Sequence, residues 1–330
     1  METTVTPRCL KTLCALALTA LATAASAQGS DLPPEGKTVK IIVPFAPGGT
    51  SDILGRKLAQ DLATRIARTV VVENRAGAGG SLGTEATVRG DADGSTILLH
   101  SGAISVEPAL KPNQPYDVQR DLAPVTTAVA GPFAVLVNNA LPVRTFPELL
   151  AYSKANPGKL NYGSPGVGSS IHLTTEYLKA AAGLDWLHVP FKGASLALNA
   201  AMAGDVQVLL DPLATAKKLA EGGKLRAIAL TTGARSSLWP DMATAAEGGV
   251  NGFDAAVWYG IFVPARTPAP VLARLNREFV DILKSSAMTT WLREQGLEAI
   301  ADTPEAARRR MAGEVDNWKK IVQTKGIKAE

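Results

Sequence analysis

The chain has 330 residues, 19% charged side chains and a formal net charge of +4 at pH 7. Basic residues do not gather with interleaved aromatic ones, which argues against a nucleic-acid-binding surface, so no nucleic-acid partner is expected. The one dense basic run, residues 308–310, shares a predicted terminal helix with Glu305 and Glu314, and we expect it to form a solvated helix face. The length is enough for two α/β lobes.

The first segment, residues 1–27, is typical of a secretory signal peptide. A basic start is followed by a small, apolar stretch at 13–24 and by the cleavage motif Ala25-Ser26-Ala27. This predicts export to the periplasm. Both cysteines, Cys9 and Cys14, fall within the signal, so the mature chain is expected to have no disulfide, no thiol nucleophile and no cysteine metal site.

The mature chain opens with a strand, a tight turn and a helix. Residues 39–43 are apolar and β-branched, which predicts a buried parallel strand. Residues 53–68 carry leucine and isoleucine four positions apart, which predicts an amphipathic helix. Between them, the run Phe45-Ala46-Pro47-Gly48-Gly49 is rich in proline and glycine, as expected of a turn.

This turn has the features of an anion site. Gly48 and Gly49 let the backbone approach a ligand without an intervening Cβ, and the helix start offers free N–H groups and the positive end of the helix dipole. Thr50 or Ser51 is expected to cap the helix, and Asp52 lies in its first turn. The alternative is an ordinary βα turn that Asp52 helps to cap.

A second copy of the device follows about half a domain later. Residues 160–162 predict a short strand, and the run Gly163-Ser164-Pro165-Gly166-Val167-Gly168-Ser169 forms the loop. Ser170 opens a helix that carries His172 in its first turn and stops at Gly183. Two anion-ready helix starts suggest two lobes that face one ligand.

Strands and helices then alternate along the chain, which predicts an α/β fold whose parallel sheet carries helices on both faces. We expect further strands at residues 69–74, 95–100, 186–191, 206–210 and 225–231. We expect further helices at residues 82–89, 146–155, 194–203, 213–221, 270–285, 288–295 and 304–323.

Two apolar stretches are expected to cross between the lobes. Residues 122–129 are extended, Gly131-Pro132 interrupts them, and a strand continues at 133–137. Residues 253–262 are apolar and aromatic and are expected to form the return crossover. The prediction is therefore two discontinuous lobes, residues 28–131 with 255–330 and residues 132–254.

Motifs for catalysis and for metal or phosphate binding are absent from the sequence. No pair of histidines has metal-ligand spacing, and the glycine loops lack the lysine of a phosphate-binding loop. Ser164 is not a nucleophile elbow, because Tyr162 stands where that motif needs glycine. His172 is expected to hydrogen-bond locally or to line the cleft, not to act as a base. A binding protein without cofactor or metal is expected, not an enzyme.

The motifs resemble those of the tripartite tricarboxylate transporter receptors, the Bug or TctC-type periplasmic solute-binding proteins. The resemblance covers essentially the whole mature chain and is carried by four runs, Val43-Pro44-Phe45-Ala46-Pro47-Gly48-Gly49 with Asp52, Val72-Glu73-Asn74-Arg75 through Gly80, Asn161-Tyr162-Gly163-Ser164 through Ser170, and Val189-Pro190-Phe191-Lys192-Gly193. Two positions depart from the family pattern, Ala76 in place of a proline and Ser95 in place of a tyrosine.

The resemblance implies a type II periplasmic binding protein fold, with two α/β lobes joined by two crossover segments. Such receptors hold a carboxylate through both glycine-rich loops and deliver it to a membrane complex of one large and one small subunit. Carried onto this chain, the ligand-binding residues are 45–49 with Asp52, and 164 and 166–170 with His172. Asp211 and Trp258 are further candidates for the cleft.

Several points stay open at this level. Asp211 follows an apolar strand and either caps the next helix or faces the cleft. Aromatic residues such as Phe45 or Trp258 would select an aromatic acid, whereas Asp52 or Asp211 would select an amine. We expect a monomeric receptor for a small carboxylate. The alternative is a ligand sensor that presents the bound carboxylate to a membrane signalling partner.

Overall fold

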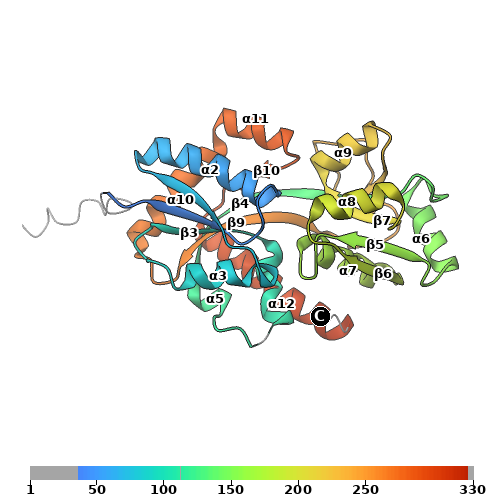
Figure 1. The fold of residues 1–330 in the computed structure, drawn as a ribbon, viewed down its shortest axis with the longest axis horizontal. Helices are drawn as coiled ribbons and strands as arrows, with labels where there is room; N and C mark the ends of the chain where they lie inside the picture. Colours follow the sequence, from blue (N-terminus) through green and yellow to red (C-terminus); the bar gives the residue numbers. More distant parts are fainter. Residues whose placement is uncertain (1–35, 112, 326–330) are drawn as a thin grey trace, which may run out of the picture.

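The computed structural model describes residues 36–111 and 113–325, and the predicted signal peptide lies outside them. Figure 1 shows two α/β lobes side by side, joined by two long strands that pass from one lobe into the other. The expected fold class is therefore confirmed. None of the helices in the two described ranges is long and apolar enough to cross a membrane.

The first lobe is built around two long strands, β4 (Leu122–Val137) and β9 (Ala256–Pro264). Before β4 come β1 (Val39–Val43), α2 (Thr50–Ile66), β2 (Val70–Asn74), η2 (Ala78–Gly80), α3 (Ser81–Val88), β3 (Thr96–Ser101), η3 (Gly102–Ser105), α4 (Glu107–Leu110) and α5 (Val118–Asp121). After β9 come α10 (Ala269–Lys284), α11 (Ser286–Glu294), β10 (Glu298–Ala299) and α12 (Pro304–Lys325).

The second lobe lies between β4 and β9. Its elements are α6 (Phe146–Ala155), β5 (Leu160–Ser164), α7 (Ser170–Ala182), β6 (Trp186–Pro190), α8 (Ala194–Ala203), β7 (Val208–Pro212), α9 (Leu213–Glu221) and β8 (Arg226–Leu230). The bounds of its four helices agree with those that the sequence predicts. As expected, α7 stops at Gly183, which adopts a left-handed conformation with φ of 65°.

The sheet is mixed, so the prediction of a parallel sheet is only partly right. The strand order is β2-β1-β3-β9-β4-β7-β5-β6, with β8 and β10 also paired to β4. β1, β2 and β3 are parallel to one another, as are β5, β6 and β7. The two connecting strands pair antiparallel to each other and to their neighbours β3 and β7.

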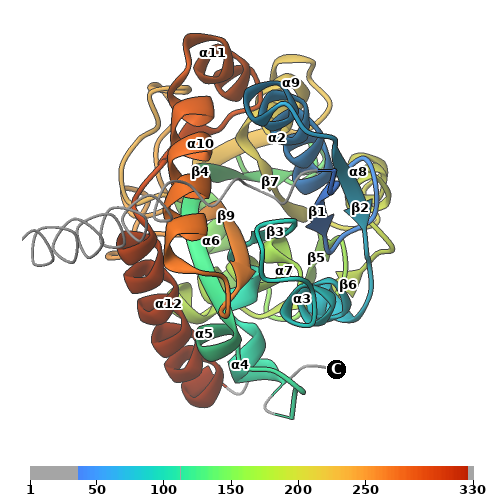
Figure 2. The same cartoon turned by 90° about the vertical axis from the view of Figure 1, so that its left-hand side faces the viewer.

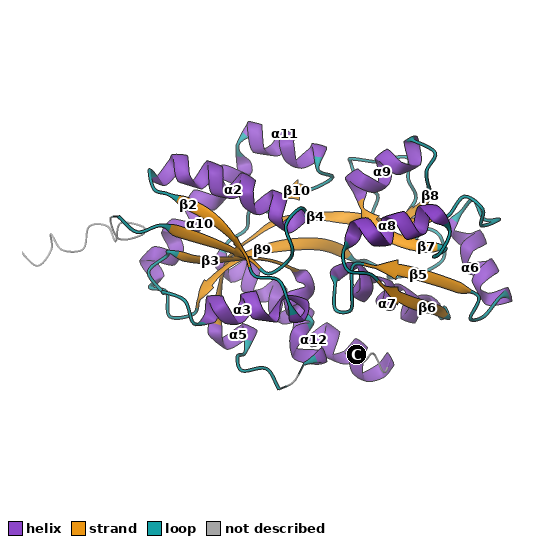
Figure 3. Cartoon of the chain, in the orientation of Figure 1, coloured by secondary structure: helices purple, strands orange, loops and turns teal. Residues whose placement is uncertain are grey.

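Helices cover both faces of this sheet, as expected for an α/β fold (Figure 3). In the end-on view, α2 and α11 lie above the strands of the first lobe, and α3 and α12 lie below (Figure 2). The leucines predicted to line α2, Leu54, Leu58 and Leu62, are fully buried. They anchor this helix, whose first turn faces the second lobe (Figure 1).

The predicted interruption at Gly131-Pro132 is wrong, because β4 runs through it for 16 residues. Gly131 and Pro132 pair with Val257 and Ala256 of β9. A Cβ on Gly131 would lie 2.6 Å from the backbone oxygen of Gly296. The glycine is therefore needed for a close backbone approach, and it does not end the strand. Both predicted lobe boundaries fall at these connecting strands, and their exact positions stay a prediction.

We expect Gly131→Ala to lower the free energy of unfolding by about 1–3 kcal/mol, because the added methyl group meets rigid backbone. Urea denaturation followed by circular dichroism measures this change. The control is Gly313→Ala on α12, where a Cβ meets open space and the helix gains about 0.5–1 kcal/mol. Equal midpoints for Gly131→Ala and the parent chain would contradict the close approach.

Candidate functional site

The loop between β1 and α2 is shaped by the buried carboxylate of Asp52. Its Oδ2 accepts hydrogen bonds from the N–H of Gly48 at 3.0 Å and from Nε of Arg56 at 3.1 Å. Its Oδ1 accepts a third from Nδ2 of Asn74 at 3.0 Å, and Asn74 also donates to the carbonyl of Phe45 at 3.1 Å. Asp52 therefore ties the two ends of the loop together, and its oxygens are already occupied within the protein.

These bonds also decide the charge of Asp52. Burial favours the neutral acid, but the hydrogen bonds from Arg56, Gly48 and Asn74 outweigh it and hold the pKa of the Asp52 carboxyl below its usual range. The carboxylate thus stays ionised at neutral pH. The stabilisation is complete above the ordinary pKa of about 4 and is lost only as the pH falls through the lower folded-state pKa.

The start of α2 differs from the prediction that Thr50 or Ser51 caps it. The N-cap is Gly49, in an extended conformation with φ of −84°, and the helix begins at Thr50. Glycine has no side chain with which to cap the first turn. The loop residues Ala46 to Gly49 are exposed. An anion that approaches this loop therefore meets backbone and the positive end of the helix dipole.

The loop between β5 and α7 is stabilised by hydrogen bonds to side chains. Oγ of Ser169 accepts the N–H of His172 at 3.3 Å and so caps α7. Nδ1 of His172 accepts the N–H of Gly168 at 3.1 Å. The imidazole is therefore neutral with its proton on Nε2, and burial lowers its pKa. Of the two roles expected for His172, the structure favours the local hydrogen bond.

Three further side chains, His188, Tyr162 and Ser164, also support this loop. The ring of His172 stacks on that of His188 at 4.2 Å, and His188 stacks on Tyr162 at 4.8 Å. Nε2 of His188 lies 2.7 Å from Oγ of Ser164, which also bonds the backbone of Gly166. Ser164 and His172 thus shape the loop through hydrogen bonds to the backbone of Gly166 and Gly168.

The two lobes meet where these loops end. Oγ of Ser170, at the start of α7, donates to Oγ of Ser101 at the end of β3, over 3.2 Å. The neighbouring residue of β3, His100, contacts the ring of Phe45 edge-on at 5.3 Å. The carboxyl end of β3 therefore lies between the two predicted loops and links them.

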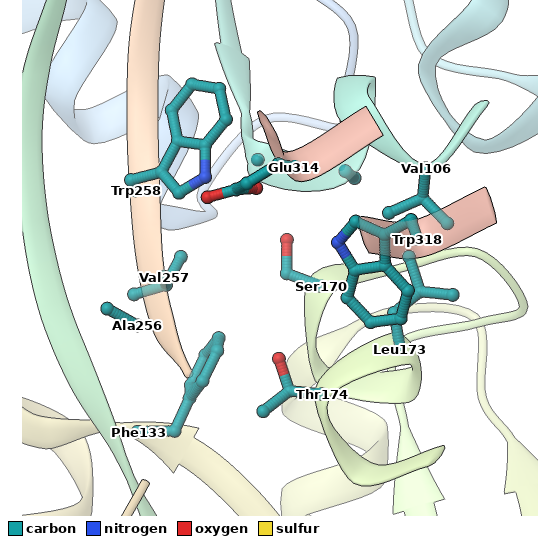
Figure 4. Close-up of a pocket in the computed structure, with 12 residues that line it drawn as sticks. Val106, Phe133, Ser170, Leu173, Thr174, Ala256, Val257, Trp258, Glu314 and Trp318 are labelled. Carbon is teal, nitrogen blue, oxygen red and sulfur yellow. The ribbon is translucent and has the colours of Figure 1, made fainter. Parts of the chain in front are cut away.

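A small cavity of about 40 Å³ opens beside this junction (Figure 4). Of the predicted site residues, Ser170 and Trp258 line it. The first lobe also contributes Gly102, Ala103, Val106, Glu314 and Trp318, and the second lobe contributes Leu173 and Thr174. The walls are completed by Phe133, Ala256 and Val257 of the connecting strands. The space suffices for roughly three water-sized groups.

Glu314 corrects the expectation of a solvated helix face. The arginines at 308–310 are exposed as predicted, but the Glu314 carboxyl lies in the cavity and faces the indole N–H of Trp258 (Figure 4). Burial raises its pKa to about 7, although the hydrogen bond from Trp258 and the charge of Arg310 oppose this. Burial thus favours the protonated form of this acid more than it would in an exposed glutamate.

Asp211 lies on the last part of β7, away from that cavity. It does not cap α9, whose N-cap is Pro212, so that alternative is wrong. Its side chain is 5% exposed, and Oδ2 has no hydrogen-bond partner among the described residues. Burial raises its pKa to about 7. Its charge also contributes to the raised pKa of Tyr259 on β9, although burial of that phenol is the larger cause.

The sequence did not indicate Glu314, Trp318 or Thr174. Helical spacing places Ser170 and Thr174 on one face of α7, which is a usable signal. Glu314 and Trp318 are likewise four apart on α12, but nothing local shows that this face meets the second lobe. Within the two described ranges, no group of three or more histidine, cysteine, aspartate or glutamate side chains could hold a metal ion.

Comparison with models of protein families identifies the family of this chain. The model of the family described as "Tripartite tricarboxylate transporter family receptor", TctC, matches residues 54–327. Among curated relatives, protein BugT of Bordetella pertussis (strain Tohama I) is 34% identical over 294 residues. That match covers 88% of this chain and 90% of BugT.

Solved structures of similar proteins indicate the same family. Rpa4515 of R. palustris, solved with adipate, is 32% identical with a TM-score of 0.83, over 89% of this chain and 99% of that one. MatC of Rhodopseudomonas palustris, solved with bound malate, is 28% identical with a TM-score of 0.79, over 87% and 99%. The matching family model describes receptors, and BugD, which is 30% identical with a TM-score of 0.80, is a periplasmic binding protein, so the family consists of solute-binding receptors and not enzymes. The chain therefore belongs to the tripartite tricarboxylate transporter receptor family, whose members are periplasmic solute-binding proteins.

Proposed function

We propose that this chain is a periplasmic receptor that captures a small carboxylate between its lobes. The observation that carries the proposal is the pair of glycine-rich helix starts, at α2 and α7, on either side of the end of β3. Each presents backbone N–H groups and the positive end of a helix dipole. The ligands named in the two solved relatives, adipate and malate, are carboxylates and support the same class.

The binding step follows from the fold. The lobes are connected through β4 and β9, so bending of these strands would open and close the cleft. Closure removes water from around the carboxylate and strengthens its hydrogen bonds to the loops. Because the donors belong to the backbone, the carboxylate is recognised whatever else the ligand carries. Neighbouring side chains then decide which carboxylate binds.

The second part of the proposal is delivery of the ligand to a membrane permease of one large and one small subunit. Membership of a transporter receptor family supports it. The test is uptake of the identified ligand by cells that lack this chain. Uptake should return when the chain is restored and should not return with a variant that cannot bind. Unchanged uptake in the deletion strain would refute delivery and favour the sensor alternative.

A thermal-shift screen tests capture directly. At about 100 times its dissociation constant, a ligand adds about 2.7 kcal/mol to the stability of the folded protein, which raises Tm by several degrees. We expect such a shift with at least one mono-, di- or tricarboxylate in a panel that also contains sugars and amines. A shift confined to the sugars or amines would refute the carboxylate proposal.

Gly49→Leu tests the loop of the first lobe. Gly49 has φ of −84° and a Cβ there meets no atom within 4 Å, so the variant should fold without strain. Its side chain would occupy the space that a ligand needs, and we expect Kd to rise at least about tenfold, or about 1.4 kcal/mol. Gly313→Leu, in open space on α12, is the matched control. Equal affinity for both variants would exclude this loop from the site.

Asp52→Ala tests the shape of the same loop. The change leaves the Gly48 N–H without its acceptor and leaves Arg56 with only the side-chain oxygen of Asn74, and we expect Kd to rise about tenfold at pH 7. Asp61→Ala is the control, because Asp61 forms a similar ion pair with Lys57 on the same helix but away from the loop. Calorimetric titration measures both variants. A loss of affinity shared by the two would point to the helix as a whole and not to the loop.

A further inference from the structure

A histidine and a glutamate face each other in the interior of the first lobe. His100 is the last residue but one of β3, and Glu107 is the first residue of α4. Nε2 of His100 lies 3.7 Å from Oε1 of Glu107, and the two side chains are 0% and 4% exposed. Both atoms are buried and have no hydrogen-bond partner among the residues that the structure describes. Neither side chain belongs to the loops assigned to the ligand, so ligand binding by those loops does not explain this pair.

The other polar atoms of the pair have partners, and these partners fix the positions of the protons. Nδ1 of His100 lies 2.7 Å from the carbonyl oxygen of Ser101, which can only accept, so Nδ1 carries a proton. Oε2 of Glu107 accepts the phenol of Tyr116 at 2.8 Å. Burial raises the pKa of Tyr116, so this phenol keeps its proton and donates it to the bond. Nε2 and Oε1 are therefore the two atoms that remain, and they face each other.

A neutral imidazole beside an ionised carboxylate would place two lone pairs against each other in the core, with no donor for either. A bridging water does not fit, because two hydrogen bonds of about 2.8 Å to one water span about 4.5 Å. We propose that His100 and Glu107 share one proton between Nε2 and Oε1, and that this pair positions the face of the first lobe that meets the second lobe. The proton forms either an N–H bond on the imidazole or an O–H bond on the carboxyl group. The total charge is the same in both forms, and a small rotation of the Glu107 side chain closes the hydrogen bond.

The pair supports two glycine-rich runs of the first lobe. The ring of His100 contacts that of Phe45, at the start of the loop between β1 and α2, edge-on at 5.3 Å. A second run, Gly77-Ala78-Gly79-Gly80, precedes α3. A Cβ on Gly80 would lie 2.6 Å from Nε2 of His100 and 3.6 Å from Oε1 of Glu107. The backbone of this run therefore packs directly on the pair.

Both of these contacts continue to the second lobe. Ser101, whose carbonyl accepts the Nδ1 proton of His100, also accepts the hydroxyl of Ser170 at the start of α7. Gly79 lies against the loop between β5 and α7, because a Cβ there would be 4.0 Å from the carbonyl oxygen of Val167. A displacement of the pair would move the first lobe at both places. A ligand held between the lobes would then lose contacts, and this effect on binding is the part of the inference that rests on the proposed function.

Charged groups on the neighbouring elements are engaged elsewhere. Lys111, which follows α4, donates to the carbonyl of Ala78 and, at 2.9 Å, to Oγ of Ser81. Glu85 on α3 pairs with Arg89 at 2.6 Å. Neither group supplies a donor to the buried carboxyl or an acceptor to the buried imidazole. The shared proton is therefore what satisfies the pair.

Nuclear magnetic resonance of the parent chain at pH 7 tests the shared proton. The chain has three histidines, and His172, whose Nδ1 accepts the Gly168 N–H, is the neutral reference. The nitrogen shifts of the His100 imidazole report whether Nε2 carries a proton, and the carboxyl carbon shift of Glu107 reports whether that group does. We expect a proton on one of the two. A proton on both, or on neither, would overturn the inference.

Glu107→Gln tests whether the hydrogen bond, and not the charge, does the positioning. Its amide N–H donates to Nε2 of a neutral His100, while its amide oxygen accepts the Tyr116 phenol. We expect this variant to bind within about threefold of the parent. Glu107→Leu removes donor and acceptor together, and we expect Kd to rise at least about tenfold. Glu85→Leu, on the helix that follows the same glycine run, is the matched control and should keep the parent affinity.

Kd is measured by calorimetric titration with acetate, malate, adipate and citrate, and the variants are compared with the ligand that the parent binds most tightly. If none of the four binds the parent, the proposed function fails for them and the spectra still decide the shared proton. If one binds, and Glu107→Leu is less stable in urea but binds it as tightly as the parent, the pair is only structural and the positioning role is overturned. Equal losses of affinity in Glu107→Gln and Glu107→Leu would overturn that role as well. If Glu107→Leu does not fold, the parent spectra and the affinity of Glu107→Gln decide.

Discussion

The strand β4 is the constraint on which the rest of the molecule depends. Its 16 residues pair with β9 and β10 in the first lobe and with β7 and β8 in the second. Because the backbone hydrogen bonds of both lobes converge on one continuous strand, the lobes are held in register with each other. The glycine at 131 is part of the same constraint, since only a residue without Cβ lets the backbone at Gly296 approach.

The two glycine-rich loops are stabilised in the same way, by a side chain that accepts a backbone N–H, but the side chains are of different kinds. Asp52 holds the first loop by accepting the Gly48 N–H, and His172 holds the second by accepting the Gly168 N–H. In each case a buried polar side chain in the first turn of a helix fixes the glycine loop that precedes it. Such side chains form their hydrogen bonds with the loop backbone. A polar residue near a binding site therefore need not touch the ligand.

Two carboxyls, the buried Asp211 and the half-buried Glu314, have the opposite character to Asp52. Asp211 and Glu314 each have a pKa of about 7 because burial is not compensated by strong donors. They come from different lobes, because Asp211 lies near the end of β7 and Glu314 lies on α12, where it lines the cavity beside the junction.

The local hydrophobic pattern of the sequence by itself determined most of the helices and strands, including the bounds of α6 to α9 and the two glycine-rich helix starts. It could do so because the periods of strands and helices, and the stop at Gly183, depend only on residues that are neighbours in the sequence. The resemblance of the motifs indicated the family. The tertiary structure alone decided that β4 continues through Gly131-Pro132, that Gly49 and not Thr50 or Ser51 is the N-cap of α2, and that Glu314 leaves the solvated face to line a cavity. Each of these depends on what a distant segment places against the residue, and a pattern of neighbours along the chain contains no information about that contact.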